Sequence, residues 1–106
     1  MTLVRNKSLP AQHPGKVFKT KILDAHNITI SAAAKKMQVN RPHLNNFTQG
    51  KVSVSAAFAM KLEVATGISA GFWMNLQKTY DLHINRNLVT EAEPLYAINT
   101  ISQHTK

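Results

Sequence analysis

The stretch ISAAAKKMQVNRPHLNNFTQGK, residues 30 to 51, reads as two short helices joined by a tight turn. In its first half, Ala33, Ala34 and Met37 fall on one helical face and are expected to pack inward. In its second half, Leu44 and Phe47 are three residues apart, so they also share a face. The other side chains of the second half carry hydrogen-bonding groups that point elsewhere: Arg41, His43, Asn45, Asn46 and Gln49. This arrangement is the helix-turn-helix pattern that enters the major groove of DNA.

Residues that favour helix ends bound both helices. Thr29 is the predicted N-cap of the first helix and Asn40 that of the second, because their side-chain oxygens can accept a hydrogen bond from a first-turn amide. Pro42 suits the first turn of the second helix, where its missing N–H removes no helical bond. Gly50 ends that helix where a left-handed residue is needed. The recognition helix is therefore expected at about residues 41–49.

The charge of the chain is lopsided. The 106 residues carry a net charge of +8, from 13 lysines and arginines against 5 carboxylates. Residues 1–53 hold nine of the cations and only Asp24 as an anion, whereas residues 54–106 hold four of each sign. All of the net charge lies in the half with the helix-turn-helix, which suggests a polyanion as partner. A solvated basic surface that binds nothing is the alternative.

Length and composition limit the class of protein. A chain of 106 residues suits one domain, and this size can bury a single core without cross-links. There is no cysteine, which excludes disulfides, thiolate metal sites and a cysteine nucleophile. No apolar run approaches the roughly 20 residues of a membrane span. The N-terminal MTLVRNKSLPAQ lacks the apolar core of a secretory signal. We therefore expect a cytoplasmic protein.

Two more helices are predicted, one before and one after the helix-turn-helix. One begins at Pro14 and runs to about His26, with Asn27 as a left-handed residue after it. Its apolar stripe consists of Val17, Phe18, Ile22, Leu23 and Ala25. The other follows Ser55 as N-cap and ends at Gly67. Its expected core face consists of Phe58, Ala59, Leu62 and Ala65, with Met60 at the margin.

A last helix is predicted over residues 70–82. There, Phe72, Leu76 and Tyr80 are spaced by four and form one stripe, and Trp73 lies next to it. Five helices with short connections indicate a compact all-α bundle.

The two ends of the chain are expected to lie outside the bundle, which would occupy residues 13–83. Residues 1–12 show no periodicity and are predicted to be a mobile arm. Residues 84–106 form a C-terminal tail that Pro94 interrupts. The helical spacing of three apolar residues allows a short terminal helix there: Leu95, Ile98 and Ile101.

The string FWMNLQKTYDL at residues 72–82 is far more discriminating than a helix-turn-helix alone, which very many repressors share. Together with His13-Pro14-Gly15 and the ISAAAKKM–RPHLNNFTQGK pair, it resembles the HigA/VapI-type antitoxins of the lambda-repressor-like (Xre) helix-turn-helix family. The resemblance covers about residues 13–83. It implies a five-helix fold, a homodimer, and repression of the protein's own operon through a palindromic operator in double-stranded DNA. It also implies a small basic toxin, a RelE-like ribonuclease, as the partner that the antitoxin neutralises.

The same resemblance assigns positions within the helix-turn-helix. Two residues fall in the supporting helix, Thr29 and Ala34. The base-facing start of the recognition helix then holds Arg41, Pro42, His43 and Asn45. The sequence departs from the family at Gln38, where glycine is usual; a glutamine at positive φ costs roughly 1 kcal/mol, so the turn is expected to differ slightly. It departs again on the usually acidic first helix, which puts toxin binding by that face in doubt: Lys16, Lys19 and Lys21.

We expect the DNA contacts to divide into base readers and phosphate binders. Arg41 has the geometry for a guanine fork, Asn45 or Asn46 can pair with adenine, and His43 can donate to a base acceptor or a phosphate. The expected phosphate contacts are Lys35, Lys36, Gln49 and Lys51. The complete predicted DNA-binding set is Thr29, Lys35, Lys36, Asn40, Arg41, Pro42, His43, Asn45, Asn46, Gln49 and Lys51.

Other functions find less support in the sequence. The family suggests Trp73, Met74 and Gln77 as dimer contacts, and for Trp73 a place in the core or the dimer surface is favoured over base stacking. The five histidines are scattered singly and the carboxylates form no acid–base pair, so no metal, cofactor or catalytic site is expected. Two alternatives stay open: a helix-turn-helix repressor without a toxin partner, and a protein-interaction module that has lost DNA binding.

Overall fold

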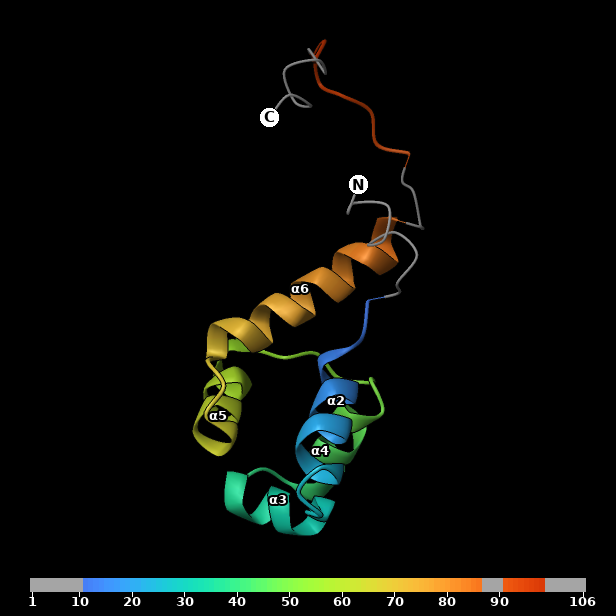
Figure 1. The fold of residues 1–106 in the computed structure, drawn as a ribbon. Helices are drawn as coiled ribbons and strands as arrows, with labels where there is room; N and C mark the ends of the chain where they lie inside the picture. The colour runs from blue at the N-terminus through green and yellow to red at the C-terminus, as the bar shows by residue number, and fades with distance from the viewer. Residues whose placement is uncertain (1–10, 87–90, 99–106) are drawn as a thin grey trace, which may run out of the picture.

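The computed structural model describes residues 11–86 and 91–98, which include five helical rods and no strand. The first rod combines α2 (Pro14–Val17) with η1 (Phe18–Asp24), and the others follow in chain order: α3 (Ile30–Met37), α4 (Arg41–Thr48), α5 (Ala56–Thr66) and α6 (Ala70–Arg86). Figure 1 shows α6 lying across one end of the bundle and α3 at the opposite end. The predicted all-α fold is confirmed.

The first rod is continuous, although its second part is a π-helix. Val17 and Phe18, at the junction, both have right-handed helical backbone angles. The rod ends at Asp24, slightly before the predicted His26, and Asn27 takes the expected left-handed conformation with φ of 55°. Of the predicted stripe, Phe18 and Leu23 are buried and two members are half-buried, Val17 and Ile22. Ala25 is exposed, so its place in the stripe was wrong: the helix ends before it can turn that residue inward.

The core is assembled from one face of each rod. Its buried apolar side chains are Phe18, Leu23, Ala33, Ala34, Met37, Leu44, Phe47, Val54, Phe58, Ala59, Leu62 and Trp73. On α5, however, Ala65 and Met60 are exposed, contrary to expectation. The buried residues Phe58, Ala59 and Leu62 already fill the contact of α5 with its neighbours, and Met60 lies on the other side of the helix.

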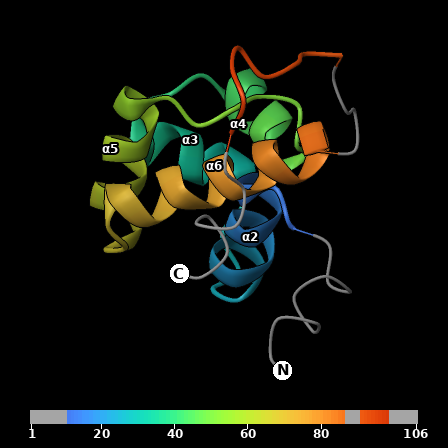
Figure 2. The ribbon, with the colours of Figure 1, turned by 90° about the horizontal axis from the view of Figure 1, so that it is seen from above.

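The predicted stripe on α6 was also wrong. Phe72 is 43% exposed, and Leu76 and Tyr80 are only half-buried, whereas Trp73 is fully buried and Gln77 nearly so. Trp73 and Gln77 are four residues apart, so they share a face, which lies about one residue around the helix from the predicted one. This register buries the larger indole, and the polar Gln77 is accommodated because it finds hydrogen-bond partners. Seen from above, α6 crosses the bundle (Figure 2).

The helix α6 reaches Arg86, beyond the predicted end at Leu82. In the tail, residues 91–98 are not helical, so the part of the suggested terminal helix that the structure describes is absent. Its remainder, 99–106, and most of the predicted arm, 1–10, lie outside the described residues. In the part of the chain that is described, no helix is long and apolar enough to cross a membrane.

Candidate nucleic-acid interface

The caps of α3 and α4 fix where the two helices of the helix-turn-helix begin. Thr29 Oγ1 accepts a hydrogen bond from the Ala32 amide at 3.1 Å. Asn40 Oδ1 accepts one from the His43 amide at 2.8 Å. Each bond satisfies a first-turn donor that has no partner within its helix, and such caps contribute about 1 kcal/mol each. Both predicted N-caps are confirmed.

The turn between the helices depends on a left-handed residue. Gln38 adopts φ of 57° and ψ of 46°, so it takes the conformation in which glycine is usual. Its amide bonds back to the carbonyls of Ala34 and Lys35, and the Val39 amide also reaches Ala34 at 3.1 Å. These bonds satisfy the last carbonyls of α3 and reverse the chain. Gln38 itself therefore adopts the left-handed conformation that the turn requires.

A contact from α5 supports this turn and was not foreseen from the sequence. Lys61 Nζ donates a hydrogen bond to the Gln38 carbonyl at 2.8 Å. The two residues are 23 apart in sequence, so no local pattern could have indicated the pair. The bond joins α5 to the point where the chain passes from α3 to α4.

The recognition helix is anchored by its inward face. Leu44 and Phe47 have no exposed surface, and Phe47 contacts the rings of Phe18 and Phe58. Gly15 lies against its backbone: a Cβ added there would be 1.6 Å from the Phe47 carbonyl oxygen. The first helix and α4 thus meet backbone to backbone, and only glycine permits this approach. The Pro14-Gly15 pair was the sequence signal for this contact.

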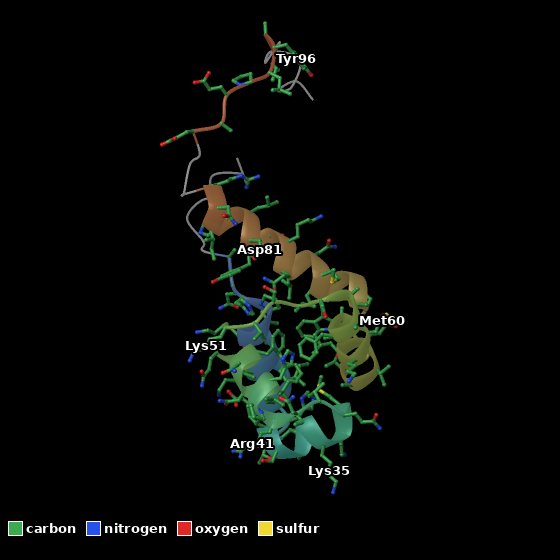
Figure 3. The ribbon with its side chains drawn as sticks, turned by 180° about the vertical axis from the view of Figure 1, so that it is seen from behind. Lys35, Arg41, Lys51, Met60, Asp81 and Tyr96 are labelled. Atoms are coloured by element: carbon green, nitrogen blue, oxygen red, sulfur yellow. The ribbon has the colours of Figure 1, made fainter. Side chains whose placement is uncertain are left out.

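The eleven predicted DNA-binding residues are all at least partly accessible. Nine are exposed: Thr29, Lys35, Lys36, Asn40, Arg41, Pro42, Asn45, Gln49 and Lys51. Two are half-buried, His43 and Asn46. Figure 3 shows Lys35 and Arg41 at the end of the molecule away from Asp81 on α6. The structure thus brings the predicted residues onto α3, α4 and the flanking turns.

Two of these residues have other contacts as well. The ring of His43 meets Phe58 edge to face, with centroids 5.0 Å apart, so the imidazole is held against the start of α5. The Oδ1 atom of Asn40 accepts the capping bond described above. Arg41 and Asn45 are exposed on the same helix and have long or amide side chains suited to base edges.

The segment after α4 is fixed by two polar side chains, His13 and Gln77, whose burial the sequence analysis did not predict. His13 is 5% exposed, and its Nδ1 accepts the Gly15 amide at 2.9 Å, which caps the first helix. Burial lowers the pKa of this imidazole, while its hydrogen bond to the Val52 backbone and the Asp81 carboxylate oppose the shift. Val54, in the same segment, donates its amide to Gln77 Oε1 at 2.9 Å.

The predicted dimer contacts differ in accessibility. Trp73 and Gln77 are buried within one chain, so they present little surface to a second copy. Met74 is 38% exposed. Other apolar side chains on α6 are exposed as well, Phe72 and Leu82.

The lysines of the first helix lie at the surface. Lys16, Lys19 and Lys21 are all exposed, and Lys19 pairs with Asp24 at 3.1 Å. An ion pair this exposed contributes little to stability. Among residues 11–86 and 91–98, no three His, Asp or Glu side chains are grouped so that they could hold a metal ion.

A helical bundle with a capped helix-turn-helix and an exposed polar recognition helix defines a helix-turn-helix domain. The family described as Helix-turn-helix matches residues 20–73, half of the chain. The protein is 36% identical over 77 residues to "Antitoxin HigA-1" of Vibrio cholerae, covering 73% of this chain and 72% of that relative. The chain belongs to this helix-turn-helix family, and within it to the group of HigA-type antitoxins and virulence-associated proteins.

Two further comparisons agree. "Virulence-associated protein A'" of Dichelobacter nodosus is 42% identical over 71 residues, covering 66% of this chain but 61% of that relative, less than two thirds of its length. The structure described as "Pseudomonas aeruginosa antitoxin HigA with higBA promoter" superposes with a TM-score of 0.72 and 31% identity. That match covers 81% of this chain and 99% of the other.

Proposed function

We propose that this protein is the antitoxin of a type II toxin–antitoxin module, which represses its own operon and neutralises a RelE-like ribonuclease toxin. DNA binding is supported by the exposed polar surface of α3 and α4. Buried side chains on the opposite face of α4, Leu44 and Phe47, hold this surface in place. The HigA antitoxin of Pseudomonas aeruginosa, to which the fold is similar, was solved with the higBA promoter. We correspondingly expect this chain to bind its own promoter. A protein with this function would act in the cytoplasm.

Within this function, Arg41 reads a guanine through a two-pronged hydrogen bond to O6 and N7. Asn45 or Asn46, on the same helix, pairs with adenine, and His43, whose ring packs on Phe58, donates to a base acceptor or a phosphate. Cationic and polar residues around this centre hold the DNA backbone: Lys35, Lys36, Gln49 and Lys51. Thr29, Asn40 and Pro42 complete the surface at the helix starts.

A palindromic operator requires two copies of the chain. The exposed apolar side chains of α6, including Met74, provide the surface for a homodimer in this proposal. Trp73 and Gln77 act from inside each protomer, because they are buried. Sedimentation equilibrium at micromolar concentration tests the dimer, and a monomer there would remove it.

Binding of the chain's own promoter is tested by gel shift across a range of salt concentrations. The affinity should fall steeply as salt rises, since several phosphates are contacted. Arg41→Ala should weaken operator binding by about 1–3 kcal/mol and relax sequence preference, whereas Lys51→Ala should weaken all sequences alike. An unchanged operator affinity in Arg41→Ala would show that another surface reads the bases.

The toxin partner is tested by co-expression with the neighbouring reading frame, scored as rescue of growth. A repressor without a toxin is the second candidate, and the exposed lysines of the first helix favour it, because they would repel a basic toxin: Lys16, Lys19 and Lys21. If expression of the neighbouring gene alone stops growth and co-expression of this chain restores it, the antitoxin function is supported. A neighbour without toxicity supports the plain repressor.

A further inference from the structure

The segment that links α4 to α5 has little regular structure, yet it is anchored at both ends. At its start, the Lys51 amide donates to the Asn46 carbonyl at 2.9 Å, after the left-handed Gly50. Near its end, the Val54 amide donates to Gln77 Oε1 at 2.9 Å. The first anchor is local, whereas the second comes from α6, 23 residues further along the chain.

Gln77 is held in place for this contact. Its side chain is 6% exposed, and its Nε2 donates to Asp81 Oδ1 at 2.9 Å, one turn further along α6. Both ends of the amide are therefore satisfied, which fixes its orientation. A buried polar side chain stabilises a fold only when its hydrogen bonds are made, so this glutamine is tied to the position of Val54.

A second buried group holds the same segment between these anchors. The His13 ring hydrogen-bonds to the backbone of Val52 and packs edge to face on Tyr80 of α6, with centroids 5.0 Å apart. His13 thus contacts Val52 and Gln77 contacts Val54. Lys51, which directly precedes them, is exposed. Figure 3 shows Lys51 beside the helix-turn-helix, well away from Met60 on α5.

We propose that Gln77, with His13, is a positioning residue for DNA binding. By fixing Val52 and Val54, these side chains hold Lys51 in place beside the recognition helix, where its ammonium meets a backbone phosphate. A flexible lysine on an unfixed loop would lose more conformational freedom on binding, so its contact would contribute less. This inference rests on the proposed DNA-binding function, and it assigns a DNA-binding role to side chains that cannot touch DNA.

A double-mutant cycle tests the coupling between Gln77 and Lys51. Lys51→Ala should reduce promoter affinity and lower the slope of log affinity against log salt by about 1, since one phosphate contact is lost. Gln77→Met nearly keeps the side-chain volume but leaves the Val54 amide without its acceptor, and should weaken binding about threefold to tenfold. In the Gln77→Met background, Lys51→Ala should have a much smaller effect than in the unmodified chain.

Glu63→Ala is the matched control. Glu63 Oε1 accepts the Ala70 amide at 2.6 Å, so this variant also deletes a side-chain acceptor of a backbone amide, but at the other end of α6. Lys51→Ala should retain its full effect in the Glu63→Ala background. Should Gln77→Met fail to fold, Asp81→Ala replaces it: Asp81 is exposed, and its removal releases the Nε2 end of the Gln77 amide and also removes the negative charge near His13.

The outcomes separate this inference from the proposed function. Faster hydrogen exchange at the Val54 amide of free Gln77→Met, together with a non-additive cycle, supports the positioning role. Promoter binding with additive effects of Lys51→Ala and Gln77→Met overturns the positioning role alone. Promoter binding that Lys51→Ala leaves unchanged does the same, because there is then no contact to position. No promoter binding by the unmodified chain overturns both proposals.

Discussion

The hydrogen bonds that begin the two helices of the helix-turn-helix are local, whereas the bond that anchors the α4–α5 segment on α6 is distant. At the end with α3 and α4, the capping bonds of Thr29 and Asn40 each span three residues. At the end with α6, the bond between Val54 and Gln77 spans 23 residues. Local bonds shape a helix wherever it stands, whereas distant bonds decide how the helices are placed. The surface that we propose reads DNA therefore has locally capped helices, while the segment that follows it is anchored on α6.

The orientation of α6 is tested by truncating its buried and its exposed aromatic side chain in separate variants. Trp73→Ala should lower the free energy of unfolding by about 3–5 kcal/mol, because it empties a fully buried site. Phe72→Ala, its neighbour in sequence, should cost only about 1 kcal/mol, since Phe72 is 43% exposed. Urea unfolding monitored by circular dichroism measures both. Equal losses, or a larger loss for Phe72, would contradict the observed rotation of α6.

The contact of the first helix with α4 links the two ends, and glycine substitutions test it. Gly15→Ala should destabilise the fold by about 3 kcal/mol, because the new Cβ would collide with the Phe47 carbonyl. Gly71→Ala is the control: its Cβ would meet nothing closer than Ser69 Oγ at 3.9 Å, and alanine favours the helix by up to about 1 kcal/mol. Urea unfolding should thus move in opposite directions for the two. A tolerated Gly15→Ala would mean that α4 is seated differently.

The buried cap of the first helix should make stability depend on pH. Burial lowers the pKa of His13, so the unfolded chain binds a proton more readily than the folded one. The stability that the neutral His13 contributes is complete above the ordinary histidine pKa of about 6.5. It is lost as the pH falls below 6.5 toward the lower pKa of His13 in the folded chain. The free energy of unfolding should therefore be lower at pH 5 than at pH 7.5. Protonation would also place a hydrogen on Nδ1, where the Gly15 amide now donates.

A variant isolates this histidine from other titrating groups. His13→Asn keeps an oxygen that can cap the helix but does not titrate. It should flatten the decline in the free energy of unfolding between pH 7.5 and pH 5. A decline of the same size in His13→Asn would assign the pH dependence to other groups.

The difference between local and distant contacts also explains what could be predicted from the sequence. Helix starts followed from Thr29, Asn40 and Ser55, because a capping side chain and its amide are three residues apart. The exposure of the polar face of α4 followed from the spacing of Leu44 and Phe47, whereas its contacts with DNA stay a prediction. The register of α6 did not: period alone favoured a stripe beginning at Phe72, since apolar residues recur there every four positions.

What decided that register lay elsewhere in the chain. A polar Gln77 can face the core only because Val54 offers an amide and Asp81 an acceptor. His13 was likewise noticed only at the head of the first helix and as one of five single histidines, and its burial depends on Val52 and Tyr80, which are distant in sequence. Such partners become visible only when the helices have been placed. Buried polar residues were therefore the main omission of the sequence-based prediction.

The smallest expected effect tests the local end, at the turn of the helix-turn-helix. Gln38→Gly should raise the free energy of unfolding by up to about 1 kcal/mol, because φ of 57° is strained for glutamine and not for glycine. Asn27→Gly, at φ of 55°, should gain less, since asparagine tolerates this conformation better. Thermal unfolding of both variants measures the difference. No gain at Gln38 would indicate that the Lys61 bond to its carbonyl already offsets the strain, so that even this local turn is held from a distance.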